Sequence, residues 1–305
     1  MLGETGLWLL FSVIMSVVLC IDLGIMQKKA HVVSFQEALF WTLAWSLLAF
    51  GFAGVIALSS GRERAMQFIA GFLLEKSLSA DNMFVFILIF SYFGIPPLYQ
   101  SRILHWGILG AIAMRFLLIF AGVALINTFH WMIYVFGAVL VYTGAKMAFQ
   151  KEEAVDPGRN PALRLFKRFM PLTAGHDEQR FFVRIQGVLH ATPLFATLLV
   201  VEFSDLVFAM DSIPAVIAIT TDTLVVYTSN VFAIMGLRAL FFLLASMMGM
   251  FRYLKFGISV ILVFVGFKMM AGPFYHIPTS ASLCVIAGIL AASIAASLLD
   301  KEKTA

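Results

Sequence analysis

The chain has 305 residues, of which 61% are hydrophobic and only 12% are charged, and its mean hydropathy is +0.96. Soluble domains contain about 25% charged residues, so this composition excludes a water-soluble globular protein and predicts an all-α polytopic membrane protein. The formal net charge of +4 could suggest an anionic partner, but the basic residues gather in the connections between apolar segments. We therefore expect the lipid bilayer as a partner and no nucleic acid.

Apolar segments of the length needed to cross a bilayer occur nine times along the chain. They cover residues 6–26, 36–58, 66–93, 103–125, 131–149, 193–219, 229–250, 254–272 and 281–299. We expect one transmembrane domain over residues 1–305, with two N-terminal spans (6–58), a first repeat (66–149), a connection (150–190), a second repeat (193–272) and a final span (281–299).

Basic residues predict the orientation in the membrane. The odd-numbered connections and the C-terminal tail hold fourteen lysines and arginines, whereas the even-numbered connections and the N-terminus hold only Arg62 and Arg64. This asymmetry predicts an N-terminus outside and a C-terminus in the cytoplasm of a bacterial inner membrane. The first segment follows MLGETG, which has no basic residue, so we expect it to be retained and not cleaved as a signal peptide.

Cysteine and histidine offer no cofactor site in this sequence. Cys20 and Cys284 lie in the first and last spans without C-x-x-C spacing, and every histidine falls at or beyond a predicted span end. This pattern predicts no redox pair, no bis-histidine haem and no permanently bound cofactor.

The third segment contains an unusual polar stretch, LLEKSLSADNMFVF at residues 73–86, with Glu75, Lys76, Asp81 and Asn82. As one helix, residues 66–93 would be roughly 42 Å long, whereas a bilayer core is about 30 Å thick. We therefore expect this helix to be interrupted near residues 77–82, which would let its acids converge.

The chain repeats itself from the third span onward. Asp81 matches Asp205, Arg115 matches Arg238, and TGAKM at 143–147 matches VGFKM at 265–269, at offsets of 124, 123 and 122. Each unit holds three spans, an odd number, so the second copy must enter from the opposite face. The pattern predicts an inverted repeat of spans 3–5 and 6–8, with a second interrupted helix near residues 204–214.

The connection at residues 150–190 is polar and contains Pro157, Gly158 and Pro161, which break helices. We expect a cytoplasmic linker. A short amphipathic segment on the membrane surface, at RLFKRF, is the alternative.

Nine charged residues lie within or at the ends of apolar spans, where each costs about 2.5–3.5 kcal/mol at the bilayer centre. The carboxylates outnumber the cations, so an excess of negative charge predicts a cation site. Serine hydroxyls nearby favour Mg²⁺, Ca²⁺ or Mn²⁺, and Met210 would favour Mn²⁺ if it reached the site. The alternative is a set of ion pairs that hold helices together, which we expect above all for the cations. The acids are Asp22, Glu75, Asp81, Glu202, Asp205 and Asp211, and the cations are Lys76, Arg115 and Arg238.

EKSLSADN at 75–82 and EFSDLVFAMDSIPA at 202–215 resemble the TerC family of integral membrane proteins, and the long connection between the repeats resembles its Alx-type branch. The resemblance covers roughly residues 5–300. It implies tellurium resistance, redox modulation or manganese efflux. It also implies that the motif acids form the site, namely Glu75, Asp81, Glu202, Asp205 and Asp211; the residues themselves add Asp22 and Asn82.

We conclude from the sequence that the chain is a secondary transporter that exports Mn²⁺, and not an enzyme. No G-x-x-x-x-G-K-[ST] motif occurs that would bind a nucleotide to drive transport. The alternative is a membrane-bound redox modulator or a tellurium-resistance-associated protein without transport activity. The oligomeric state and the coupling ion stay open.

Overall fold

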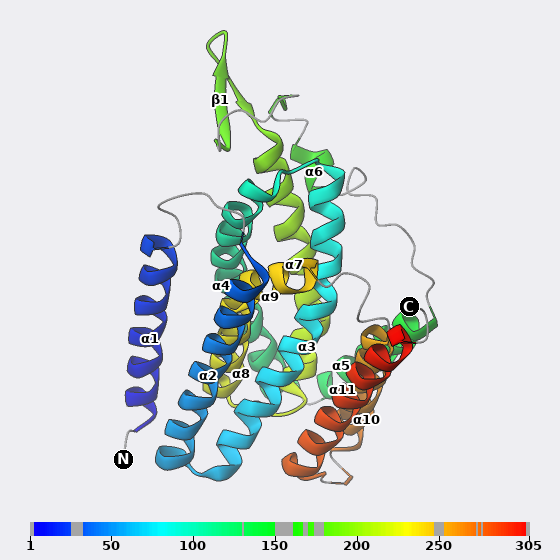
Figure 1. Cartoon of the computed structure of the whole chain (residues 1–305). Coiled ribbons are helices and arrows are strands. Elements are labelled where there is room, and N and C mark those ends of the chain that lie inside the picture. Colours follow the sequence, from blue (N-terminus) through cyan, green and yellow to red (C-terminus); the bar gives the residue numbers. More distant parts are fainter. Residues whose placement is uncertain are drawn as a thin grey trace.

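The computed structural model describes residues 3–25, 33–129, 131–149, 161–166, 170–173, 180–246, 253–272, 274–275 and 277–302, apart from some side chains within these ranges. Figure 1 shows a bundle of long helices with one small β-hairpin at one end. The helices are α1 (Glu4–Ile25), α2 (Phe35–Ser60), α3 (Arg62–Tyr92), α4 (Pro97–Thr128), α5 (Met132–Phe149), α6 (Pro161–Phe166), α7 (Pro193–Ile217), α8 (Thr223–Met235), α9 (Leu237–Ser246), α10 (Leu254–Ala271) and α11 (Thr279–Glu302); the strands are β1 (Phe182–Ile185) and β2 (Val188–Ala191).

Five helices of the described residues are long and apolar enough to cross a membrane by themselves: α2, α4, α5, α7 and α11. The pair α8 and α9 makes a sixth candidate if its two members form one span. Helices lie at all nine predicted positions, which confirms an all-α polytopic membrane protein. A count of nine crossings is not confirmed, because α1 and α10 contain only shorter apolar stretches, Glu4–Cys20 and Phe256–Ala271, and α3 is not among the described helices that are apolar enough over a membrane-spanning length.

Helices α3 and α7 are each continuous, over 31 and 25 residues. The predicted interruptions near residues 77–82 and 204–214 are therefore wrong. Two serines show why polar residues need not interrupt these helices. The hydroxyl of Ser77 donates to the carbonyl of Leu73 at 2.6 Å, and the hydroxyl of Ser204 donates to the carbonyl of Val200 at 2.7 Å. Both hydroxyls are satisfied four residues back along an intact helix.

The broken helix lies elsewhere, in the seventh predicted span. There α8 ends at Met235, α9 begins at Leu237, and the two are bent by 45° about Gly236. Residues on both sides of the bend are buried almost without exception, so this irregular backbone lies inside protein. Irregular backbone at membrane depth is tolerated under that condition.

The helices pack in matched pairs, with α3 against α8, α4 against α7, and α5 against α10. The α5–α10 pair is close enough to require glycine: a Cβ on Gly137 would lie 2.9 Å from the carbonyl oxygen of Gly266, and a Cβ on Gly266 would lie 2.7 Å from that of Gly137. Small residues at such crossings let the two backbones approach.

Helix α1 packs on this core through one stripe of buried side chains. Leu7, Phe11, Met15 and Val18 recur at helical spacing and are buried. The Phe11 ring contacts Phe52 of α2 and Phe232 of α8, so α1 covers the outside of both helices.

The hairpin in the 150–190 connection was not predicted. Strands β1 and β2 pair antiparallel, with Phe182 opposite Ala191 and Ile185 opposite Val188. The two turn residues, Gln186 and Gly187, have positive φ angles of 50° and 83°, as a tight two-residue hairpin turn requires. Of the RLFKRF segment, Arg164–Phe166 belongs to α6, and residues 167–169 lie outside the described part of the chain.

Candidate functional site

Arg115 of α4 lies at the centre of the charged residues and is fully buried. Its Nη1 forms an ion pair with Oε1 of Glu75 on α3. Its Nη2 donates to Oδ1 of Asp205 on α7 at 3.1 Å. Nη1 also donates to Oδ1 of Asn230 on α8 at 3.2 Å and lies 3.5 Å from the hydroxyl of Ser212. One guanidinium therefore joins four helices in the middle of the bundle.

The helix pairing explains this convergence. Helix α3 packs on α8, and α4 packs on α7, so one side chain on α4 can reach all three neighbours. An arginine suits the position because its planar guanidinium presents several donors in a fixed fork, and it stays charged when it is buried. Glu75 and Asp205 thus meet through tertiary packing of two intact helices, and not through a break within one.

The charges around Arg115 do not balance. Glu75 is fully buried and Asp205 is 4% exposed, so two buried carboxylates share one guanidinium. The second oxygen of each, Oε2 of Glu75 and Oδ2 of Asp205, is buried and has no hydrogen-bond partner among the described residues. Orphaned buried oxygens are costly, so each of these two oxygens needs a physical reason, such as a bound water or ion or a functional role.

Glu202 lies one turn before Asp205 on α7 and extends this negative region. Its carboxylate packs against Gly110 of α4, where a Cβ would overlap the carboxylate atoms. Glu202 and Asp205 line a cavity of about 20 Å³ between α4 and α7. That volume is enough for one water or one ion.

Lys76 follows Glu75 on α3, but its amino group lies elsewhere, against Gly236 at the bend between α8 and α9. The Nζ atom is buried without a hydrogen-bond partner among the described residues, so the ion pair expected for Lys76 is not seen there. Nζ faces the C-terminal end of α8, where the helix dipole favours a cation. Arg238, just after the bend, is 6% exposed and interacts with neighbouring groups.

Several predicted site residues are described only in part. Asp22, Asp81 and Asp211 lie within α1, α3 and α7, but their side chains are outside the described part of the structure. Asn82 is partly buried on α3. Within the described residues, no three His, Cys, Asp or Glu side chains form a group that could hold a metal ion.

Asn230 and Gly110 contact the charged residues, and neither was predicted from the sequence. Asn230 is fully buried and accepts a hydrogen bond from Arg115. The sequence signal was the polar run Thr228-Ser229-Asn230 at the start of the seventh apolar segment. Nothing in the sequence marked Gly110. A glycine is needed there because α4 packs so closely on α7 that a Cβ would overlap the Glu202 carboxylate.

Comparison with known proteins identifies the family. The model for the integral membrane protein TerC family matches residues 60–305. The chain belongs to the TerC family. An "Uncharacterized membrane protein STKORF319" of Myxococcus xanthus is 50% identical over 98% of this chain and 94% of that protein. Proteins named "Putative membrane-bound redox modulator Alx" are similar over 94% of this chain and 92% of their own length, at 46% identity in Salmonella typhi and 44% in Escherichia coli K12.

The Alx-type resemblance is thereby confirmed, and these relatives cover 94–98% of the chain. No solved structure matches the chain.

Proposed function

We propose that this TerC-family protein is a secondary transporter that exports divalent metal cations, with Mn²⁺ as its substrate. The observation that carries the proposal is the charge ratio at Arg115, where two buried carboxylates meet one guanidinium and the second oxygen of each has no hydrogen-bond partner among the described residues. Carboxylate oxygens are the ligands that Mn²⁺ prefers, and an intramembrane acid that is not fully paired marks an ion pathway.

The site we propose comprises Glu75, Glu202 and Asp205, together with Asp81, Asp211, Asn82 and Asp22. Helix α7 supplies one further feature: Pro214 has no N–H, so the carbonyl of Met210 loses its usual helical partner. A carbonyl freed in this way beside Asp211 is an additional oxygen ligand for a cation.

Internal symmetry supports a transporter architecture. We propose that α3–α5 and α7–α10 form an inverted repeat. The offset of 122 residues that relates Gly144 to Gly266 also relates Gly137 to Ser259. Gly137 contacts Gly266, and a Cβ on Gly144 would lie 2.7 Å from the carbonyl oxygen of Ser259, so the two contacts are images of each other. Reciprocal contacts of this kind are expected at a twofold axis.

The same relation, applied to the pair of Arg115 and Asp205, predicts a second pair between Arg238 and Asp81.

In the membrane we propose the N-terminus outside and residues 150–190 in the cytoplasm of a bacterial inner membrane. The N-terminus and the β-hairpin lie at opposite ends of the bundle, as this topology requires (Figure 1).

Transport is tested with purified protein in liposomes that contain a Mn²⁺-quenched dye. We expect Mn²⁺ added outside to quench the dye faster than in protein-free liposomes, and cells that carry the protein to hold less manganese than cells without it. Equal rates in both kinds of liposome, with unchanged cellular manganese, would refute the transporter.

Redox modulation is the second candidate function, because relatives of this chain carry the name "Putative membrane-bound redox modulator Alx". Cys20 and Cys284 are the chain's two cysteines, and they are exposed, free and on helices at the two ends of the sequence. We expect the double variant Cys20→Ala, Cys284→Ala to keep full Mn²⁺ transport. Loss of activity in that variant, measured in the same liposomes, would favour the redox function.

A further inference from the structure

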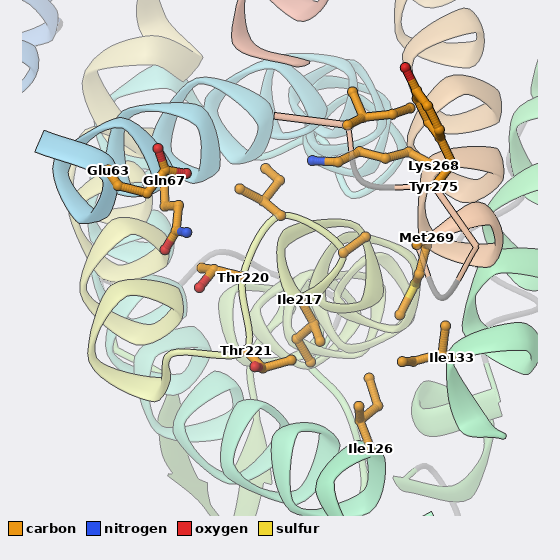
Figure 2. Close-up of a pocket in the computed structure, with 14 residues that line it drawn as sticks. Glu63, Gln67, Ile126, Ile133, Ile217, Thr220, Thr221, Lys268, Met269 and Tyr275 are labelled. Atoms are coloured by element: carbon orange, nitrogen blue, oxygen red, sulfur yellow. The ribbon is translucent and has the colours of Figure 1, made fainter. Parts of the chain in front are cut away.

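A second, larger cavity of about 470 Å³ lies at the end of the bundle where α3 begins and α7 and α10 end. Its volume is more than ten times the roughly 30 Å³ that one water occupies in the liquid. In the topology proposed above, all the helix ends that line it face outside. Figure 2 shows Glu63, Gln67 and Thr220 on one side of the cavity, with Lys268 on another wall and its amino group directed inward.

A row of residues on α3 leads from this cavity toward Arg115. Glu63 and Gln67 line the cavity, and two further steps of four residues reach Gly71 and then Glu75. Residues four apart lie one above the other on a helix and form a continuous ridge. The rise from Gln67 to Glu75 is roughly 12 Å.

Gly71 is the narrow point of this row. A Cβ there would lie 2.8 Å from the hydroxyl oxygen of Ser229 on α8 and 3.3 Å from Val216 on α7. Val216 precedes Ile217, which lines the cavity, and Ser229 precedes Asn230, which accepts from Arg115. The close approach of Gly71 to Ser229 therefore lies along α3 between the cavity and the charged site.

We propose that the 470 Å³ cavity is the vestibule through which a hydrated divalent cation leaves for the outer solution, and that the contact of Gly71 with Ser229 is its closed gate. This inference rests on the proposed transport function. The vestibule offers oxygen ligands of the kind that hard divalent cations prefer, from Glu63, Gln67 and Thr220. Lys268 is close enough to Glu63 to act on it electrostatically.

Accessibility of single cysteines tests the vestibule directly. In the Cys20→Ala, Cys284→Ala background, Gln67→Cys is treated in intact cells with a positively charged, membrane-impermeant methanethiosulfonate reagent. We expect labelling from outside, slowed by millimolar Mn²⁺, and at least a tenfold lower transport rate after labelling. Phe68→Cys is the matched control, since Phe68 is one residue further along α3 and 1% exposed, and it should stay unlabelled.

Thr220→Cys, in the same cavity, serves the same measurement if Gln67→Cys is poorly expressed. Absence of labelling at both positions, labelling only in permeabilised cells, or labelling without any effect on transport would overturn the vestibule. If wild-type protein moves no Mn²⁺ in liposomes, the transport function fails, and the vestibule for its exit fails with it. Normal wild-type transport together with unlabelled cysteines removes the vestibule alone.

Discussion

At the residue scale, the contacts of Arg115 show that the two alternatives from the sequence, a cation site and a set of structural ion pairs, involve the same carboxylates. Glu75 and Asp205 were expected as metal ligands, and Arg115 was expected in a structural ion pair. The structure places both acids on the same guanidinium, and the second oxygen of each acid has no partner in the described part of the chain. Under the proposed function, each acid stabilises the bundle with one oxygen and binds a cation with the other.

This arrangement predicts that either acid alone can be lost without unfolding the protein. In Asp205→Asn, Glu75 still compensates Arg115, so we expect normal amounts of folded protein but at least tenfold weaker Mn²⁺ binding, because one ligand charge is gone. The measurement is the yield of monodisperse protein in detergent together with a Mn²⁺ titration. Unchanged affinity in this variant would remove Asp205 from the site.

The double variant Glu75→Gln, Asp205→Asn is expected to behave differently. It leaves a buried, uncompensated guanidinium, which costs about 3–5 kcal/mol and should strongly reduce folded protein. Adding Arg115→Met removes the orphaned charge and should restore folding but not transport. A double variant as stable as wild type would show that Arg115 has other carboxylate partners.

At the element scale, a substitution at Gly110 of α4 tests the position of Glu202. A Cβ at Gly110 would overlap the Glu202 carboxylate, whereas a Cβ at Gly107, one turn earlier, would lie 3.5 Å from Val201 in ordinary contact. We expect Gly110→Ala to displace Glu202 and slow Mn²⁺ transport about tenfold, equivalent to about 1.4 kcal/mol. Because Gly107 lines the same small cavity as Glu202, the control is Gly54→Ala on α2, where a Cβ has nothing within 4 Å. This control should transport normally, and equal rates in Gly110→Ala and Gly54→Ala would place Glu202 outside the path.

The α5–α10 crossing makes a second prediction about an element. Gly266→Ala would place a Cβ 2.7 Å from the backbone oxygen of Gly137 and 3.0 Å from the Cβ of Leu140, which a rotamer change cannot relieve. We expect this variant to lose about 1–3 kcal/mol of stability. Thermal unfolding in detergent measures the loss. Gly54→Ala on α2, with nothing within 4 Å of its Cβ, should be neutral or slightly stabilising, and a similar loss there would argue against a specific contact at Gly266.

The continuity of α3 and α7 shows where reasoning from length fails. As one helix the apolar run at 66–93 exceeds the thickness of the bilayer core, yet α3 is continuous over 31 residues. An apolar helix longer than the bilayer core can tilt instead of breaking. Serines along both helices donate back to their own backbone and leave it intact. The bend at Gly236 lies instead in the seventh predicted span, between the polar Asn230 and the charged Arg238.

At the scale of the whole molecule, the orientation predicts where the C-terminus lies. A reporter enzyme fused after Ala305 that works only in the cytoplasm should be active, whereas one that works only in the periplasm should be inactive. The physical reason is the fourteen-to-two distribution of basic residues between the two sides. The opposite pattern of reporter activity would reverse the topology and place the vestibule on the cytoplasmic face.

The sequence by itself determined the class of molecule, its family and the positions of its helices. Hydrophobicity along a chain is a local property, and a bilayer imposes one simple requirement on it, so apolar segments can be read directly. The same reasoning identified Glu75, Arg115, Glu202 and Asp205 as unusual, because a charge inside an apolar run is costly wherever the chain then folds.

Only the tertiary structure decided which of these charges meet. Glu75, Arg115, Asp205 and Asn230 come from four helices, and their contact depends on α3 packing against α8 and α4 against α7. It also decided that Lys76 lies at the bend about Gly236, apart from the acid beside it in sequence, and that Gly110 makes room for Glu202. Neighbours across helices are set by shape and close packing over the whole bundle, which no local pattern of residues encodes.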